Sequence, residues 1–297
     1  MTAKVVVGID ELGAASDVVA AATTEAVRRQ AVLHMIHAGE QPVFAGHLGV
    51  AYVRTGEPAR QRLDREYLED VLRRVRVSSP GLMVEGTLAL GRASDLLVEH
   101  SHGAHLLVIG HHGRGPTPEV ILGSTARAIL RRAHCPVLIV PCGDAAVGAI
   151  QHVIVGADGS TLSDAALAWA YDECALWNAP LTIIHGWSYP HHALRTGIAG
   201  SRARAEADAA SALASAVDRL GAAKGTEVTV EAKLVEGNVA DVLHHEAGTA
   251  DLVVVGGHGR SVVRKLLRGP ISASLVDHLP CRVVVVPASA LALAPMS

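Results

Sequence analysis

Residues 106–113 read LLVIGHHG, and nine residues later the chain continues with GST at 123–125. Residues 252–259 read LVVVGGHG, and after another nine residues the chain continues with GP at 269–270. The second string lies 146 residues after the first. An apolar run that ends in glycine, followed by a glycine that opens a helix, predicts a strand, a loop and a helix N-terminus with free N–H groups for an anion. The chain is therefore predicted to hold two similar domains, each with a phosphate-binding loop.

The repeat extends through most of each half, which supports two domains rather than a local duplication. The early matches have an offset of 148 and the late ones an offset of 146. The matching pairs are VVVGID at 5–10 with VIVGAD at 153–158, LHMIHA at 33–38 with LTIIHG at 181–186, GRASDLL at 91–97 with GNVADVL at 237–243, and CPVLIVP at 135–141 with CRVVVVP at 281–287. We predict a first domain over 1–142, a linker over 143–151, a second domain over 152–288 and a tail over 289–297.

Apolar runs alternate with segments of helical period in each half. Strands are predicted at 4–9, 32–37, 82–88, 105–109 and 136–140, and in the second half at 152–157, 180–185, 227–234, 251–255 and 282–286. Helices are predicted near 16–30, 57–76, 92–102 and 123–133, with loops at 39–57 and 188–204. Strands of Val, Ile and Leu alternating with helices predict a parallel sheet covered by helices on both faces.

Composition excludes several classes of function. The 297 residues carry a formal charge of −3 and only 3% aromatic side chains, which gives neither a basic surface nor stacking groups for nucleic acid. No apolar stretch reaches the length that spans a bilayer, and the first residues lead directly into a strand without a signal-peptide core. We expect a cytoplasmic protein without membrane contact. The four cysteines form no C-x-x-C pair, and Cys135 and Cys281 are expected to be buried thiols.

The spacing G-x2-G-x9-G-[S/T], the strand-G-x-D opening and the C-P-V final strand resemble the universal stress protein family over nearly the whole chain. The resemblance implies two tandem, doubly wound, Rossmann-like parallel sheets of five strands, each in the order 3-2-1-4-5. It also implies ATP binding, which is found in many members. In this order the first and fourth strands are neighbours, and ligands of such sheets bind at that switch point.

The predicted ligand contacts gather at the ends of these two strands. Gly110 and Gly113 let backbone approach the ligand, and Gly123, Ser124 and Thr125 open a helix with free N–H groups. By resemblance, Asp10 lies at the adenine or ribose end, and the backbone of Ala38 bonds the adenine edge. The full predicted set is Gly8, Asp10, Ala38, Gly110, Gly113, Gly123, Ser124, Thr125, Gly156, Asp158, Gly186, Gly256, Gly259 and Gly269.

The two predicted sites are unequal, and each feature has an alternative interpretation. Pro270 replaces the serine or threonine of the family pattern and removes two donors. Arg260, Arg264, Lys265 and Arg268 either compensate by charge or form a solvated helix face. Asp10 and Asp158 either contact nucleotide or cap the following turn, and strand-end glycines also serve ordinary turns.

The 17 histidines show no metal-binding spacing, so no metal site is predicted. His37 and His185 are expected to pack or hydrogen-bond near the nucleotide. His111 and His112 either touch the ligand or face solvent.

No catalytic residue is predicted, because the chain lacks a Walker A sequence and a G-x-S-x-G elbow. The expected function is a stress-response regulator that binds ATP, with or without Mg²⁺. The alternatives are a slow ATPase and a protein-interaction scaffold without nucleotide. The expected partners are an adenine nucleotide (ATP, AMP and cyclic AMP are not distinguished) and an unidentified protein. The resemblance also implies that the strands at 137–140 and 283–286 pair within the chain, and a homodimer is left open.

Overall fold

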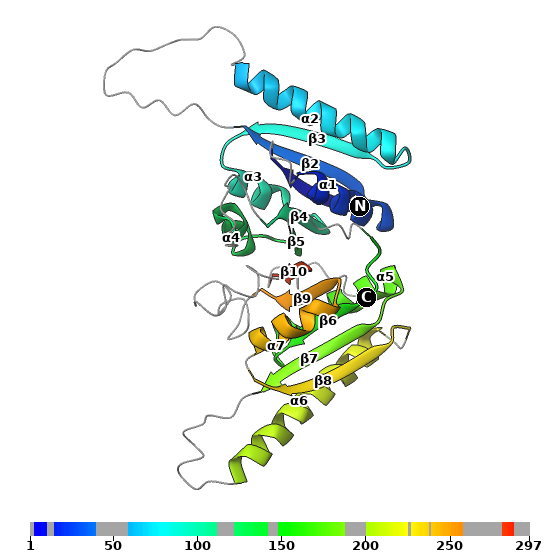
Figure 1. Cartoon of the computed structure of the whole chain (residues 1–297), viewed down its shortest axis with the longest axis vertical. Helices are drawn as coiled ribbons and strands as arrows, with labels where there is room; N and C mark the ends of the chain where they lie inside the picture. The colour runs from blue at the N-terminus through cyan, green and yellow to red at the C-terminus, as the bar shows by residue number, and fades with distance from the viewer. Residues whose placement is uncertain are drawn as a thin grey trace, which may run out of the picture.

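The computed structural model describes residues 3–10, 15–39, 59–111, 122–141, 148–187, 200–224, 227–237, 239–257 and 281–287. Ten strands alternate with helices along these residues (Figure 1). The strands are β1 Lys4–Ile9, β2 Val32–Gly39, β3 Val84–Leu90, β4 Leu106–Gly110, β5 Val137–Val140, β6 Val153–Ala157, β7 Leu181–Trp187, β8 Val230–Glu236, β9 Leu252–Gly256 and β10 Arg282–Val286. The helices are α1 Ala15–Arg28, α2 Ala59–Ser78, α3 Ala93–His100, α4 Ser124–Leu130, α5 Thr161–Trp177, α6 Gly200–Lys224 and α7 Val239–Glu246, with a short 3₁₀ turn at Ala247–Thr249.

The ten strands form one sheet rather than two. Its order is β3-β2-β1-β4-β5-β10-β9-β6-β7-β8, so each half keeps the predicted order 3-2-1-4-5 and the two five-stranded halves are joined into one continuous sheet. The halves join where β5 and β10 pair antiparallel, with Leu138 opposite Val284, as expected for these two strands. Both strands are buried and, apart from Arg282 at the start of β10, apolar, and an unpaired edge of this kind would be open to association with other chains. We call the β5–β10 pair the domain seam.

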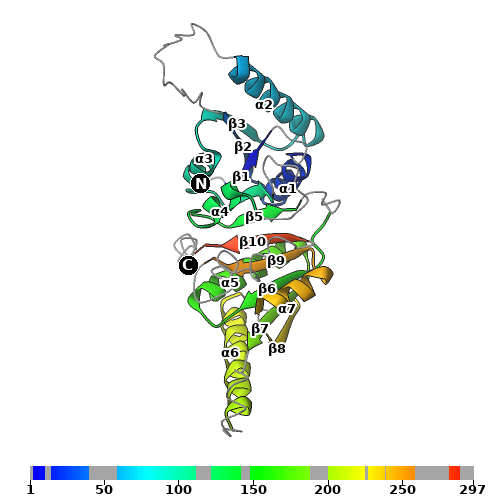
Figure 2. The same ribbon diagram turned by 60° about the vertical axis from the view of Figure 1, so that its left-hand side comes forward.

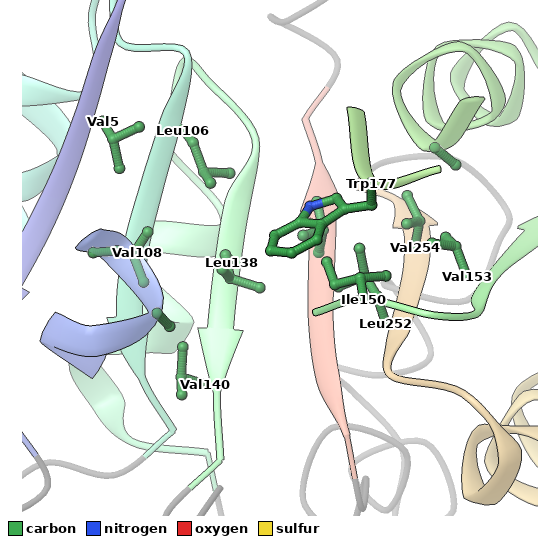
Figure 3. Packing of buried hydrophobic residues seen from close by; sticks show 14 of the residues in the cluster. Val5, Leu106, Val108, Leu138, Val140, Ile150, Val153, Trp177, Leu252 and Val254 are labelled. Carbon is green, nitrogen blue, oxygen red and sulfur yellow. The ribbon is translucent and has the colours of Figure 1, made fainter. Parts of the chain in front are cut away.

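The sheet has a helical layer on each face, which confirms the predicted α/β class. Strand residues alternate between the layers: Val5 and Val7 pack in the cluster that contains α1, α2, α5 and α6, whereas Val6 packs in the cluster with α3, α4 and α7. Figure 2 shows these layers on either side of the sheet. The first cluster is continuous across the domain seam, where Trp177 extends over β10 toward Leu138 (Figure 3).

Two of the repeated glycines have a packing role. A Cβ at Gly8 would lie 2.7 Å from Cδ1 of Leu97 on α3, and a Cβ at Gly156 would lie 2.9 Å from Cδ1 of Leu243 on α7. Each glycine therefore lets its helix approach the first strand of its half. Both glycines belong to the predicted ligand set, and the packing explains their presence without a ligand.

One helix begins earlier than the sequence predicts. Residues 200–204, for which the sequence predicts a loop, form the start of α6, and ten of its 25 residues are alanine, the strongest helix former. Most of the predicted loops at 39–57 and 188–199 lie outside the described residues.

Cys135 and Cys281 are buried free thiols, as expected, and burial raises the pKa of Cys135 to about 12. Among the described helices, none combines the length and the apolar character needed to cross a bilayer.

Candidate functional site

The first candidate site lies at the C-terminal ends of two neighbouring strands. β1 and β4 run parallel, with Val5 opposite Leu106 and Val7 opposite Val108. Asp10 follows β1 directly, and Gly110 is the last residue of β4. The topology therefore brings these two predicted residues to one edge of the sheet, at the switch point where doubly wound sheets bind ligands.

The end of β1 is held from β2 and α2. Nδ1 of His37 lies 3.1 Å from the carbonyl oxygen of Ile9, so this nitrogen donates to that carbonyl. The hydroxyl of Tyr67 on α2 donates to the carbonyl oxygen of Asp10 at 2.5 Å. The expected hydrogen bonding of His37 near the site is confirmed, and the two bonds fix the backbone that carries Asp10.

A buried carboxylate lies beside this support. Asp64 on α2 is 1% exposed, and neither of its oxygens has a hydrogen-bond partner among the described residues. Its Oδ1 is 3.7 Å from Nε2 of His37 and 3.1 Å from Nε of Arg60, which is half exposed. A buried carboxylate is costly unless it is paired, so these two side chains are its electrostatic partners.

Asp64 and Tyr67 are not among the residues that the sequence predicts at the site. The signal for Asp64 was available, because Asp64, Leu68, Val71 and Val75 share the buried face of α2 at spacings of 4, 3 and 4. The buried residues of α6 follow the same spacing and are all apolar: Ala209, Leu213, Ala216 and Leu220. An acidic residue on an apolar helical stripe therefore distinguishes the first half from the second.

The second candidate site has the same strands and a different first turn. β6 and β9 are neighbours. Nδ1 of His185 lies 2.8 Å from the carbonyl oxygen of Ala157, and this contact is equivalent to the one between His37 and Ile9 in the first half. Oδ1 of Asp158 accepts from the backbone N–H of Ser160 at 3.0 Å and from its hydroxyl at 2.5 Å. Ser160 in turn caps α5 by accepting from the N–H of Ser163. Asp158 thus fills the turn-capping role that was one of its two predicted alternatives.

The glycine loop of the first half is described at its two ends. The N–H of Gly123 donates to the carbonyl oxygen of His111 at 3.3 Å, so the end of β4 and the start of α4 lie together. Gly123 is the N-cap of α4, followed by Ser124 and Thr125 as predicted. His111 is 6% exposed, so the alternative in which it faces solvent is wrong.

Ala38, Gly186 and Gly256 lie at the ends of β2, β7 and β9. The remaining residues that the sequence singles out lie outside the described residues: Gly113, Gly259, Gly269, Pro270, His112 and the basic residues at 260–268.

A cavity of about 460 Å³ lies away from these sites. It is lined by Asp95, Val98, Glu99, His102, Arg132 and His134. These residues precede β4 and β5, so the cavity lies at the opposite edge of the sheet from Asp10 and Gly110. Within the described ranges, no group of three or more His, Cys, Asp or Glu side chains is arranged to hold a metal ion.

The fold defines a class of protein: a tandem pair of doubly wound α/β domains joined into one sheet, each with a switch point between its first and fourth strands. The model of the universal stress protein family matches residues 1–141 and 149–287. The chain belongs to the universal stress protein family.

Relatives and solved structures agree with this assignment. Universal stress protein Rv2623 of Mycobacterium tuberculosis is 31% identical over 288 residues, which are 95% of each chain. Universal stress protein Rv2005c of the same organism is 32% identical over 208 residues, 69% of each chain. The crystal structure of a universal stress protein from Archaeoglobus fulgidus has a TM-score of 0.67 at 17% identity and covers 96% of both chains, which shows a shared fold.

Proposed function

We propose that this protein binds an adenine nucleotide, ATP in particular, at the ends of β1 and β4 and acts as a nucleotide-dependent regulator of the stress response. The observation that carries the proposal is that Asp10 and Gly110 meet at the switch point of the first half. Asp10 supplies a charged acceptor for the ribose hydroxyls or the adenine, and the glycines around the loop leave room for the phosphates. The backbone of Ala38 supplies the contact to the adenine edge.

We propose that the first site binds more tightly than the second. In the first half, α4 begins with a glycine cap followed by Ser124 and Thr125, whose N–H groups and hydroxyls are available for phosphate oxygens. In the second half, the sequence has Pro270 at the corresponding place, and Oδ1 of Asp158 is already used by Ser160. The proposed role is regulation through binding rather than turnover.

Replacing Asp10 by asparagine is expected to weaken ATP binding at the tighter site by about tenfold, since a hydrogen bond to a charged acceptor contributes roughly 1.5–3 kcal/mol. Titration calorimetry of the wild type and Asp10→Asn with ATP measures this change. Asp218→Asn is the matched control, because Asp218 is exposed on α6. Unchanged affinity in Asp10→Asn would remove Asp10 from the site, and no heat signal in the wild type at millimolar ATP would refute the proposed function.

A further inference from the structure

Two buried carboxylates occupy equivalent positions in the two halves. Glu25 on α1 and Glu173 on α5 are 148 residues apart, which is the offset of the strands on either side of these helices. Each is 2% exposed. The residues four places later, Arg29 and Trp177, are also equivalent, so a cation in the first half corresponds to a neutral indole in the second.

These four side chains meet where the two halves join. The guanidinium of Arg29 donates to Oε2 of Glu25 through one terminal nitrogen and to Oε2 of Glu173 through the other. The indole Nε1–H of Trp177 donates to Oε1 of Glu173 at 2.8 Å. The guanidinium of Arg28 lies 4.4 Å from the centre of the Trp177 ring, on which it stacks. We call Glu25, Arg29 and Glu173 the carboxylate cluster.

The carboxylate cluster lacks one positive charge. Two ionised carboxylates and one guanidinium leave a net charge of −1 in a site where Arg29 itself is only 13% exposed. A buried uncompensated charge is strongly disfavoured, and a bound proton removes it. Burial and the charge of Glu25 raise the pKa of Glu173 to about 8, against the opposing effects of Arg29 and the Trp177 hydrogen bond.

Among the described residues, Arg29 is the one cation that forms an ion pair with Glu25 or Glu173, and Arg28 stacks on the Trp177 ring instead. Cys174 next to Glu173 stays neutral, since burial and the Glu173 charge raise the pKa of its thiol to about 12. On α6, Lys224 pairs with Asp172 and Arg219 pairs with Asp164, both at exposed positions of α5. The strands beneath α1 and α5 contribute apolar residues of the continuous core.

We propose that the carboxylate cluster is a proton-dependent contact between the domains, which holds α1 against α5 while Glu173 carries a proton and loosens when that proton leaves. The folded protein keeps this proton at pH values where the unfolded chain has already lost it. Stability from the cluster is therefore fully present below about pH 4.5 and decreases as the pH rises to about 8. The proposal is independent of nucleotide binding.

Melting temperatures of the wild type and Glu173→Gln between pH 5.5 and 9 test the proposal. Glutamine imitates the protonated carboxyl, so the variant is expected to gain about 5 °C relative to the wild type as the pH rises through this range. Glu25→Gln is expected to weaken the pH dependence as well, because it removes the negative charge that disfavours the ionised form of Glu173. Glu69→Gln, at an exposed position on α2, is the matched control and should follow the wild type at every pH.

A second readout reports the contact itself. With Trp169 and Trp187 replaced by phenylalanine, Trp177 is the one remaining tryptophan, and acrylamide quenching of its fluorescence measures its exposure. Quenching is expected to increase from pH 6 to pH 9, and the increase should disappear when Glu173→Gln is added. A melting-temperature difference that does not change with pH, or quenching that rises equally with Glu173→Gln, would overturn the proposal.

Discussion

Replacing Gly110 by glutamate is expected to weaken ATP binding to the first domain by about 100-fold, which corresponds to roughly 2.7 kcal/mol. Gly110 ends β4 next to β1, where the proposal places the phosphates beside bare backbone. A glutamate there adds both bulk and a negative charge beside the triphosphate, and like charges at close range in a partly buried site repel strongly. Titration calorimetry with ATP measures the loss.

The matched control for this variant is Gly81→Glu, which introduces the same charge in the same domain. Gly81 is exposed, and a Cβ added there meets no atom within 4 Å. The control should bind ATP as the wild type does, and both variants should melt near the wild-type temperature. Wild-type affinity in Gly110→Glu would exclude the end of β4 from the binding site.

Replacing Trp177 by alanine is expected to lower the free energy of unfolding by about 3–5 kcal/mol, the usual cost of removing a buried large aromatic side chain. Trp177 is 7% exposed in the core that crosses the domain seam. The substitution also removes the hydrogen bond to Glu173 and the stacking with Arg28. Urea unfolding followed by circular dichroism measures the change.

Two further variants sharpen this prediction. Trp177→Phe keeps an aromatic ring and loses the N–H donor, so its loss of stability should be intermediate. Val77→Ala removes an apolar group that is 76% exposed on α2 and should change the free energy of unfolding by less than about 0.5 kcal/mol. A loss below about 1 kcal/mol in Trp177→Ala would show that this part of the seam adds little to stability.

Much of the fold could be predicted because the apolar pattern is repeated. Strands such as 5–7 and 153–155 are continuous runs of buried valine and isoleucine, and their alternation with helices restricts the fold to a parallel sheet with two helical layers. The joining of the halves into one sheet depends on the pairing of β5 with β10. These strands are far apart in the sequence, so a local sequence pattern does not predict that they pair. The expectation of that pairing came from the family resemblance.

The site was predictable at its strand ends and less so in its supports. Asp10 and Gly110 follow apolar runs, so the topology alone brings them together. The hydrogen bond from Tyr67 to Asp10 spans 57 residues and depends on how α2 lies over the sheet. The carboxylate cluster joins side chains 144 residues apart, and it arises only because the seam brings the ends of two equivalent helices together.

The most direct test of the central claim is mass spectrometry of the nucleotide released by heat from the purified full chain after incubation with ATP. The comparison is between the wild type and the double variant Gly110→Glu/Gly256→Glu, in which the last residues of β4 and β9 are both changed. An adenine nucleotide is expected on the wild type and none on the double variant. Equal amounts in both proteins, or none in the wild type, would contradict the central claim.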